Sequence, residues 1–435
     1  MKQLKWIIFC LVLFPGVYNA TPSPGAAKNK NTLNLIYPAL VDSFYAADIT
    51  GPFWYLASAA RQNMKNTFLQ LLDSASCDGL DKNKYHYAEI KNTTTAIDAT
   101  HLMQQDRLFT DAVIAYCKDL YQGCGINPWI KYDEWSGKYS RNDNDFIVGH
   151  LVTIKSDSEL NAFINSLIPD TKQYVAYQSE LQTQYQRNDI LKAKQVATSM
   201  NFYRWIHHFG FEKSIVVNIA SATLNYYENN VETLFSKMIV GKPSKKTPSF
   251  DATCKEVILY PYWNVPADIA IKELVPKYRK SPGLVGRERM QVLDGSGNIV
   301  KASAIDWSAY SSRSFPYRLR QSTGCDNSLG IIKFDLTSPF GVYLHDTNEK
   351  GLFASSNRYR SHGCMRVEKA VELGNYLLNN KLDTIFLKAC IKDVKPTTIP
   401  LKKPVPVFVI YLTAYLSDSG VVNYYRDVYH LNTEQ

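Results

Sequence analysis

The sequence predicts an α+β protein in which a helical N-terminal domain is followed by a mostly-β C-terminal domain. Apolar residues recur at three- and four-residue steps from about residue 34 to residue 122, which is typical of amphipathic helices. From Lys213 the pattern becomes β-rich, first over residues 214–220 and then in an alternating run over 223–227. The 435 residues, 45% hydrophobic and 20% charged, are enough for more than one globular domain.

The first 20 residues have the pattern of a secretory signal peptide. Lys2 and Lys5 precede a short apolar run over residues 6–14, and Ala20 offers a cleavage point. The apolar run is shorter than a comfortable membrane span, so an uncleaved anchor is the minor alternative. We therefore expect an exported, periplasmic protein that lies near the membrane but does not span it after cleavage.

We assign residues 31–205 to the helical domain. Asp78-Gly79 and Gly123 are typical helix ends, since glycine readily adopts the conformation that stops a helix. Residues 131–150 are polar and have little apolar periodicity, so they are predicted as a loop. Residues 159–185 again show helical spacing.

The β-rich domain is assigned to residues 212–395, and a strand-rich tail over 396–435 is expected to pack back on one of the two domains. Residues 267–322 interrupt the strand pattern with a helix-like run and several turns, so they are predicted as a capping subdomain. A further helix is expected over residues 371–380.

Eight cysteines become seven once the signal peptide is removed, and an odd number in an exported protein indicates one unpaired thiol. Cys364 is the candidate, because a nucleophile must stay reduced. The other six are available for disulfides in an oxidising compartment, and their spacing leaves the pairing open: Cys77, Cys117, Cys124, Cys254, Cys325 and Cys390.

The candidate active site is the run Arg-Ser-His-Gly-Cys-Met-Arg over residues 360–366. Thiol acyl transfer needs a thiolate, and a free cysteine is mostly protonated at neutral pH. The imidazole of His345, on a preceding apolar run, can take the proton of Cys364 and stabilise the resulting ion pair. The small Gly363 lets backbone N–H groups approach a developing oxyanion.

These residues resemble the catalytic signature of the YkuD-type L,D-transpeptidases, in which a histidine is followed by a Ser-His-Gly-Cys motif. Two segments of the helical domain, residues 78–86 and 106–112, are similar to the scaffold of the long Gram-negative branch of that family. Many members of this branch carry a peptidoglycan-binding module near residues 186–194, and that module is expected to be absent here. The resemblance implies a helical scaffold and a mostly-β YkuD-type catalytic domain with a capping insertion.

The resemblance also implies roles for individual residues. Cys364 would be the nucleophile and His345 the proton donor and acceptor, while Gly363 and the Cys364 amide would form the oxyanion hole. Asp346 is expected to orient the His345 ring through its carboxylate, with a backbone carbonyl as the alternative. His362 is expected to support the loop or the chemistry.

Four further residues are expected to contact substrate or to shape the cleft. Arg366 can grip a carboxylate bidentately, with a plain surface ion pair as the alternative. Ser361 is small enough to keep the loop tight, and Tyr343 and Trp263 would wall the cleft.

The implied reaction is attack of the cysteine on the bond between an L-centre and the terminal D-alanine of a peptidoglycan stem. The thioester would then pass to a diaminopimelate amine of a second stem and give a 3→3 cross-link. Water or a lipoprotein lysine as acceptor, and a non-enzymatic wall-binding scaffold, remain open. Carbapenems acylate the family's cysteine, and the same is expected here.

No metal or cofactor is expected, because none of the eight histidines shows paired ligand spacing. The net charge of +9 fits work beside anionic wall polymers, and no nucleic-acid-binding signature occurs. The expected partners are peptidoglycan stem peptides, with other wall-synthesis enzymes as further candidates.

Overall fold

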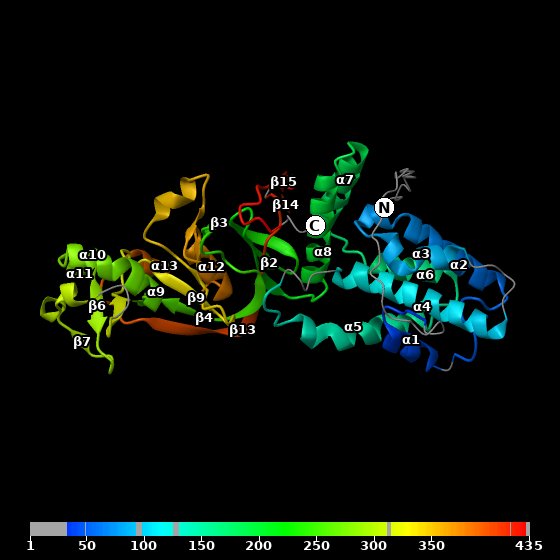
Figure 1. Cartoon of the computed structure of the whole chain (residues 1–435), viewed down its shortest axis with the longest axis horizontal. Coiled ribbons are helices and arrows are strands. Elements are labelled where there is room, and N and C mark those ends of the chain that lie inside the picture. Colours follow the sequence, from blue (N-terminus) through cyan, green and yellow to red (C-terminus); the bar gives the residue numbers. More distant parts are fainter. Residues whose placement is uncertain are drawn as a thin grey trace, which may run out of the picture. The chain divides into compact units, whose positions relative to one another are not determined.

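The computed structural model describes residues 33–47, 49–92, 98–124, 130–310, 315–417 and 419–431. The expected signal peptide over residues 1–20 lies outside these ranges. The chain divides into two compact units, one made of residues 1–124 and 140–205 and the other of residues 125–139 and 206–435 (Figure 1). In the described ranges, no helix is both long and apolar enough to cross a membrane.

The first unit is helical, which confirms the helical part of the predicted α+β fold. Its core includes the fully buried aromatic residues Trp54, Phe68 and Phe109. The helices are α1 (Pro38–Tyr45), α2 (Ala59–Asp73), η1 (Ala75–Asp78), η2 (Lys82–Tyr85), α3 (Tyr87–Lys91), α4 (Ala99–Gln122), α5 (Ser136–Leu151), α6 (Asp157–Ser166), α7 (Lys172–Gln186) and α8 (Ile190–His207).

A buried carboxylate ties an irregular stretch of this unit to α4. Asp106 is fully buried and accepts hydrogen bonds from the backbone N–H groups of Phe53 and Trp54, each at 2.7 Å, and of Tyr55 at 2.8 Å. An ionised carboxylate accepts several hydrogen bonds and donates none. The side chain therefore satisfies three backbone donors that lie outside regular secondary structure.

The prediction of a loop over residues 131–150 is wrong, since most of that stretch is α5. Only the second half of α5 carries buried apolar residues, among them Ile147 and Leu151. The helical spacing of apolar residues in the sequence is therefore short and weak. The first half is held by side-chain contacts such as the packing of the Tyr139 ring against that of Phe209 and, at its end, the 2.7 Å hydrogen bond from Gln122 Nε2 to Asp143 Oδ2. Tertiary contacts outweigh the local pattern here.

The second unit is built on a nine-stranded sheet in the order β11-β3-β12-β10-β9-β4-β13-β1-β2, and β2 also pairs with β3, so the sheet closes on itself. Its interior is filled by fully buried apolar side chains such as Val217, Phe334 and Val407. The strands are β1 (Lys213–Asn218), β2 (Thr223–Glu228), β3 (Val231–Gly241), β4 (Phe250–Leu259), β9 (Ile332–Leu336), β10 (Leu344–His345), β11 (Tyr359–Ser361), β12 (Met365–Val367) and β13 (Thr397–Ile410).

Several shorter elements complete this unit. β13 comes from the expected C-terminal tail and lies between β1 and β4 in the sheet. Sequence reasoning places residues 131–139 in the helical domain, but the backbone of Lys131 and Tyr132 bonds to the start of β4. The remaining elements are η6 (Lys350–Ala354), α12 (Ala370–Leu377), α13 (Thr384–Lys388), β14 (Ala414–Leu416) and β15 (Val422–Tyr424).

Residues 263–321 form a cap with its own sheet, in the order β5-β8-β6-β7. A separate buried cluster, which includes Tyr278, Val292 and Trp307, holds it together. The cap contains β5 (Trp263–Asn264), α9 (Ala267–Ile269), the π-helical η3 (Ala270–Leu274), α10 (Val275–Lys280), α11 (Leu284–Arg287), β6 (Met290–Leu293), β7 (Ile299–Val300), η4 (Ala302–Ala304), η5 (Trp307–Ala309) and β8 (Arg318–Gln321).

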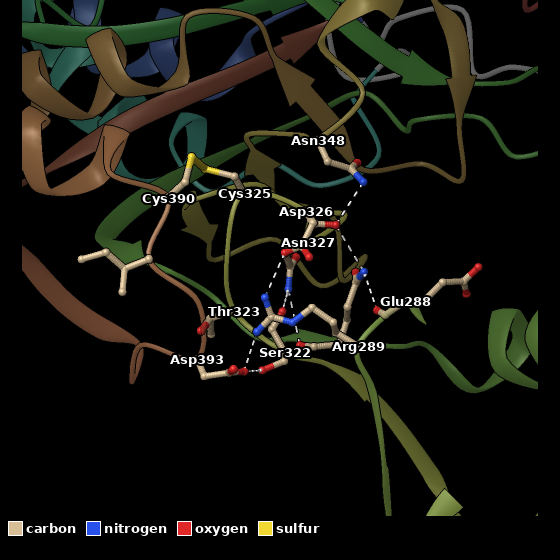
Figure 2. A network of polar contacts seen from close by, with 12 residues as sticks. Glu288, Arg289, Ser322, Thr323, Cys325, Asp326, Asn327, Asn348, Cys390 and Asp393 are labelled. Carbon is tan, nitrogen blue, oxygen red and sulfur yellow. Dashed lines mark hydrogen bonds and ion pairs between the residues drawn. A yellow bond between two sulfur atoms is a disulfide. The ribbon is translucent and has the colours of Figure 1, made fainter. Parts of the chain in front are cut away.

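A disulfide and a polar network lie where the cap joins the barrel (Figure 2). Cys325, in the connection from β8 to β9, is bonded to Cys390, which follows α13. Arg289, just before β6, pairs with Asp326 at 3.3 Å and with Asp393 at 2.5 Å. These contacts link the start of β6 and the β8–β9 connection to the segment that leads from α13 into β13.

The six cysteines considered for disulfides therefore do not form three pairs. Cys117 and Cys254 are fully buried thiols, and Cys124 is a partly buried thiol. Burial raises the pKa of all three thiols. Cysteine is among the residue types most often buried as a small apolar side chain. Burial of this kind explains the presence of these three cysteines, whose pairing the spacing in the sequence left open.

We expect the double substitution Cys325→Ala and Cys390→Ala to lower the melting temperature of the β-rich unit. A cross-link between residues 65 positions apart typically contributes about 2–4 kcal/mol by restricting the unfolded chain. Calorimetry of the oxidised protein measures the shift. Cys364→Ser, which removes a thiol outside the disulfide, is the matched control and should leave the transition in place. An unshifted transition in the double variant would contradict the assignment.

Candidate active site

Two short parallel strands bring the signature residues together. β10 and β12 pair with Leu344 opposite Met365 and with His345 opposite Arg366. Side chains alternate along a strand, and residues opposite each other point to the same face. Leu344 and Met365 are fully buried in the barrel core, so His345 and Arg366 share the other face.

Cys364 and Tyr343, the residues just before Met365 and Leu344, continue this second face. The amide of Met365 donates to the carbonyl of Tyr343 at 3.0 Å, which fixes the two segments side by side. The backbone and the side chain of Tyr343 both act to lower the pKa of the Cys364 thiol. The rings of Tyr343 and His345 meet edge to face with their centroids 5.5 Å apart. The structure thus brings Cys364, His345, Tyr343 and Arg366 onto one face.

β9 adds a cation that sequence reasoning missed. Lys333 lies opposite His345 in the antiparallel β9–β10 pair, and its Nζ is 4.2 Å from the centroid of the Tyr343 ring. Lys333 also pairs with Asp335 at 2.7 Å. Its signal in the sequence is a lysine between the apolar residues Ile332 and Phe334, but only the strand register connects it with the site.

Burial governs the protonation of the two candidate reacting groups. Desolvation raises the pKa of the Cys364 thiol, against the hydrogen bonds from Tyr343 and the charges of Lys333 and Arg366, which lower it. Desolvation also lowers the pKa of His345 to about 3, and Arg366 and Lys333 act in the same direction. Both shifts favour a neutral thiol and a neutral imidazole over an ion pair in the resting site.

The ring of His345 is oriented by a backbone carbonyl. Its Nδ1 bonds to the carbonyl oxygen of Asp346, and because a carbonyl only accepts, Nδ1 carries the proton. Nε2 is then the nitrogen that can accept a proton. The expected role of the Asp346 carboxylate is wrong: its Oδ2 accepts from the amide of Ile331 at 3.1 Å and its Oδ1 pairs with Lys350. The alternative of a backbone carbonyl is confirmed.

Two hydroxyl groups brace the loop that carries Cys364. Ser361 Oγ accepts from the amide of Gly363 at 3.1 Å and donates to the carbonyl of Cys364 at 2.5 Å. Thr247 Oγ1 donates to the Gly363 carbonyl at 2.8 Å and accepts from the amide of Gly241 at 2.9 Å. Gly363 has a φ of 120°, which side-chain-bearing residues rarely adopt. Ser361 is buried, so it holds the loop instead of substrate, and Thr247 is a brace that the sequence did not reveal.

These bonds change the predicted oxyanion hole. The N–H of Gly363 is already donated to Ser361, and that of Met365 to the Tyr343 carbonyl. Among the described residues, the N–H of Cys364 has no acceptor. The available donor of this loop is therefore the Cys364 amide, and the part of the prediction that used the Gly363 amide needs this correction.

The remaining predicted residues contact the cap or the surface. His362 Nε2 bonds to Oε1 of Glu273, in η3 of the cap, at 2.7 Å. Arg366 pairs with Glu349, so it would have to exchange this partner to grip a substrate carboxylate. Trp263 is in β5 and packs against the buried cluster of the cap.

A second contact joins the cap to the loop after β3. Lys245 Nζ is 2.8 Å from Oδ2 of Asp268, in α9. Together with the pair of His362 and Glu273, it connects the first helical segment of the cap with the Cys364 loop and with the loop after β3.

Two family models match the chain, one for an L,D-transpeptidase catalytic domain of the YkuD type over residues 212–407 and one for a scaffold domain over residues 39–181. A Haemophilus influenzae protein named "Putative L,D-transpeptidase" is 30% identical over 402 residues, which cover 89% of this chain and 77% of that protein.

Solved structures that resemble the chain include an L,D-transpeptidase from Mycobacterium smegmatis, with 15% identity and a TM-score of 0.21. Another is L,D-transpeptidase 1 of Mycobacterium tuberculosis, with 15% identity and a TM-score of 0.19. Each match covers 46% of this chain, and 58% and 61% of the two solved chains. The near full-length similarity to the Haemophilus influenzae protein and the two family matches show that this chain belongs to the YkuD-type L,D-transpeptidases with an N-terminal scaffold domain.

Proposed function

We propose that the protein is a periplasmic peptidoglycan L,D-transpeptidase with Cys364 as its nucleophile. The observation that carries this proposal is the register of β10 and β12, which sets Cys364 and His345 on one face in a domain of this family. The neutral thiol and the neutral imidazole described above are the protonation states that a base-assisted attack requires.

In the first half of the proposed reaction, His345 Nε2 takes the proton from Cys364 as the sulfur attacks the carbonyl between the third stem residue and the terminal D-alanine. The Cys364 amide donates to the oxyanion that develops. The bond to D-alanine then breaks, and the protonated imidazole returns its proton to the departing amine. An acyl thioester remains on the enzyme.

In the second half, the side-chain amine of a diaminopimelate residue attacks the thioester. An amide bond forms, the carbon–sulfur bond breaks, and the proton lost by the amine passes through His345 to the sulfur. Tyr343 supports both halves because it lowers the pKa of the thiol and so favours the thiolate form. The charges of Lys333 and Arg366 act in the same sense.

The cap supplies a means of excluding water from the thioester. Its first helical segment is joined to the Cys364 loop through His362 and Glu273 and to the loop after β3 through Lys245 and Asp268. Exclusion of water favours transfer to an amine over hydrolysis.

We expect Cys364→Ala to abolish product and His345→Gln to slow acylation about 10²- to 10⁴-fold, the usual contribution of a general base. Purified protein is incubated with defined tetrapeptide muropeptides, and the products are identified by mass spectrometry. A 3→3 dimer with release of D-alanine is the expected result. Release of D-alanine without any dimer would show hydrolysis instead, and dimer formation by Cys364→Ala would refute the nucleophile. Unchanged circular dichroism of both variants serves as the folding control.

We expect iodoacetamide to alkylate Cys364 slowly at neutral pH, and we expect the alkylation rate to keep rising beyond about pH 9. The reason is that the thiolate is the reacting form and burial raises the pKa of this thiol. Lys333→Gln should move the profile to still higher pH, since it removes a positive charge that lowers this pKa. Mass spectrometry of the peptide that contains Cys364 separates it from the other thiols. A fast rate that stays constant from pH 5 to 8 would instead indicate a resting ion pair with His345.

We expect Glu273→Gln to lower the ratio of cross-linked to hydrolysed product by up to about fivefold, because a partly exposed pair contributes up to about 1 kcal/mol to holding the cap. Glu288→Gln is the matched control, since Glu288 pairs with Lys277 inside the cap. Product ratios are read from the same muropeptide assay. Equal product ratios in both variants would show that the contact between Glu273 and His362 does not influence the choice between transfer and hydrolysis.

A further inference from the structure

A cavity of about 700 Å³ lies outside the face that carries Cys364. This volume is in the usual range of ligand sites. Its lining comes from four separate segments: the β1–β2 turn at residues 220–222, Pro243 in the loop after β3, the stretch at residues 356–359 where β11 begins, and the C-terminal segment that contains Tyr425 and His430. No residue of the candidate active site belongs to the lining that the structure describes.

The lining of this cavity is cationic. Arg358 and Arg426 give it this charge, and its described lining residues include no aspartate or glutamate. The guanidinium of Arg358 is held by neutral acceptors, with Nη2 donating to the Ser221 carbonyl at 2.8 Å and Nη1 to the Ser355 carbonyl at 3.4 Å. Arg426 is exposed. Within the described ranges, neither arginine has a carboxylate partner, so both positive charges are available to an anionic ligand.

Asp427, the acidic residue next to Arg426 in the sequence, is hydrogen-bonded to other groups near the C-terminus. Asp427 Oδ1 accepts from the hydroxyl of Tyr411 at 2.6 Å and from the amide of Leu431 at 3.1 Å. This carboxylate therefore shapes the wall that presents Arg426, and it is not among the residues that line the cavity.

The cavity wall is connected to the Cys364 loop. The ring centroid of Tyr359, a lining residue, lies 6.1 Å from that of Tyr429. The Tyr429 hydroxyl accepts from the amide of Thr247 at 3.2 Å, and Thr247 Oγ1 donates to the Gly363 carbonyl. A ligand in the cavity would thus contact the same framework that braces the loop.

The distance to the nucleophile suits a peptide. Tyr359 begins β11 and precedes Cys364 by five residues. Five residues of extended chain span at most about 17 Å, so the wall of the cavity is no farther than that from Cys364. A stem peptide of four or five residues can span the same length.

We propose that this cavity binds a carboxylate-bearing stem peptide of the acceptor strand while the amine of that strand reaches Cys364. The proposal rests on the proposed transpeptidase function and adds a site for its second substrate. Arginine forks match carboxylates bidentately, and the aromatic rings of Tyr359 and Tyr425 offer flat walls for a peptide chain.

Calorimetry with Cys364→Ala protein tests the site without turnover. The probe is the tripeptide L-alanyl-γ-D-glutamyl-diaminopimelate, and a second probe is the same peptide with its carboxylates amidated. We expect Arg426→Glu, added to Cys364→Ala, to weaken tripeptide binding at least fivefold, and we expect the amidated peptide to bind weakly to both proteins. Arg279→Ala, which removes an exposed arginine of α10, is the matched control and should leave the affinity unchanged.

Equal tripeptide affinity with and without Arg426→Glu, or no binding at all, would overturn the proposal. Acylation of the single Arg426→Glu variant by a carbapenem, followed by intact mass, keeps the two claims apart. If the cavity binds only the acceptor, the Arg426→Glu variant is acylated at the same rate as the unmodified protein. Failure of the unmodified protein to be acylated would count against Cys364 as nucleophile, whereas normal acylation with unaltered acceptor affinity would count against the cavity alone.

Discussion

The parallel pairing of β10 with β12 is the constraint on which the candidate site depends. Both strands are very short, and they send fully buried side chains into the closed barrel, Leu344 from β10 and Met365 and Val367 from β12. A shift by one residue would exchange the faces, placing His345 and Cys364 in the core and these apolar side chains outside. The same hydrophobic burial that stabilises the barrel thus determines which side chains face the substrate.

Burial also sets the chemistry of that face. His345 is nearly inaccessible to water, and its Nδ1 is committed to the Asp346 carbonyl, so the neutral ring presents Nε2 as a base. Two cations and a tyrosine surround the thiol, and they partly offset the cost of forming a thiolate in a desolvated place. The site is therefore arranged to stabilise negative charge on sulfur when it develops, while the resting thiol stays protonated.

Much of this could be predicted from local sequence, and the rest depended on contacts between distant segments. The change from helical to alternating period predicted the two kinds of domain, and the Ser-His-Gly-Cys motif with its upstream histidine pointed to Cys364 and His345. The role of Lys333 follows from strand register, and that of Thr247 follows from a hydrogen bond across 116 residues. The correct roles of Asp346 and Ser361 rest on the packing of carboxylate and hydroxyl groups against backbone amides, which no residue pattern encodes. The first half of α5 was missed because side-chain contacts to distant segments take the place of an apolar stripe there.

The most direct test of the central claim is ¹⁵N NMR of histidine-labelled protein from pH 4 to pH 8, with His345→Gln used to assign the ring signals. We predict that the His345 ring stays neutral over this pH range, with Nδ1 protonated and Nε2 able to accept the proton of Cys364. A doubly protonated ring at pH 6–7, lost when Cys364 is replaced by alanine, would show a resting ion pair and contradict the account.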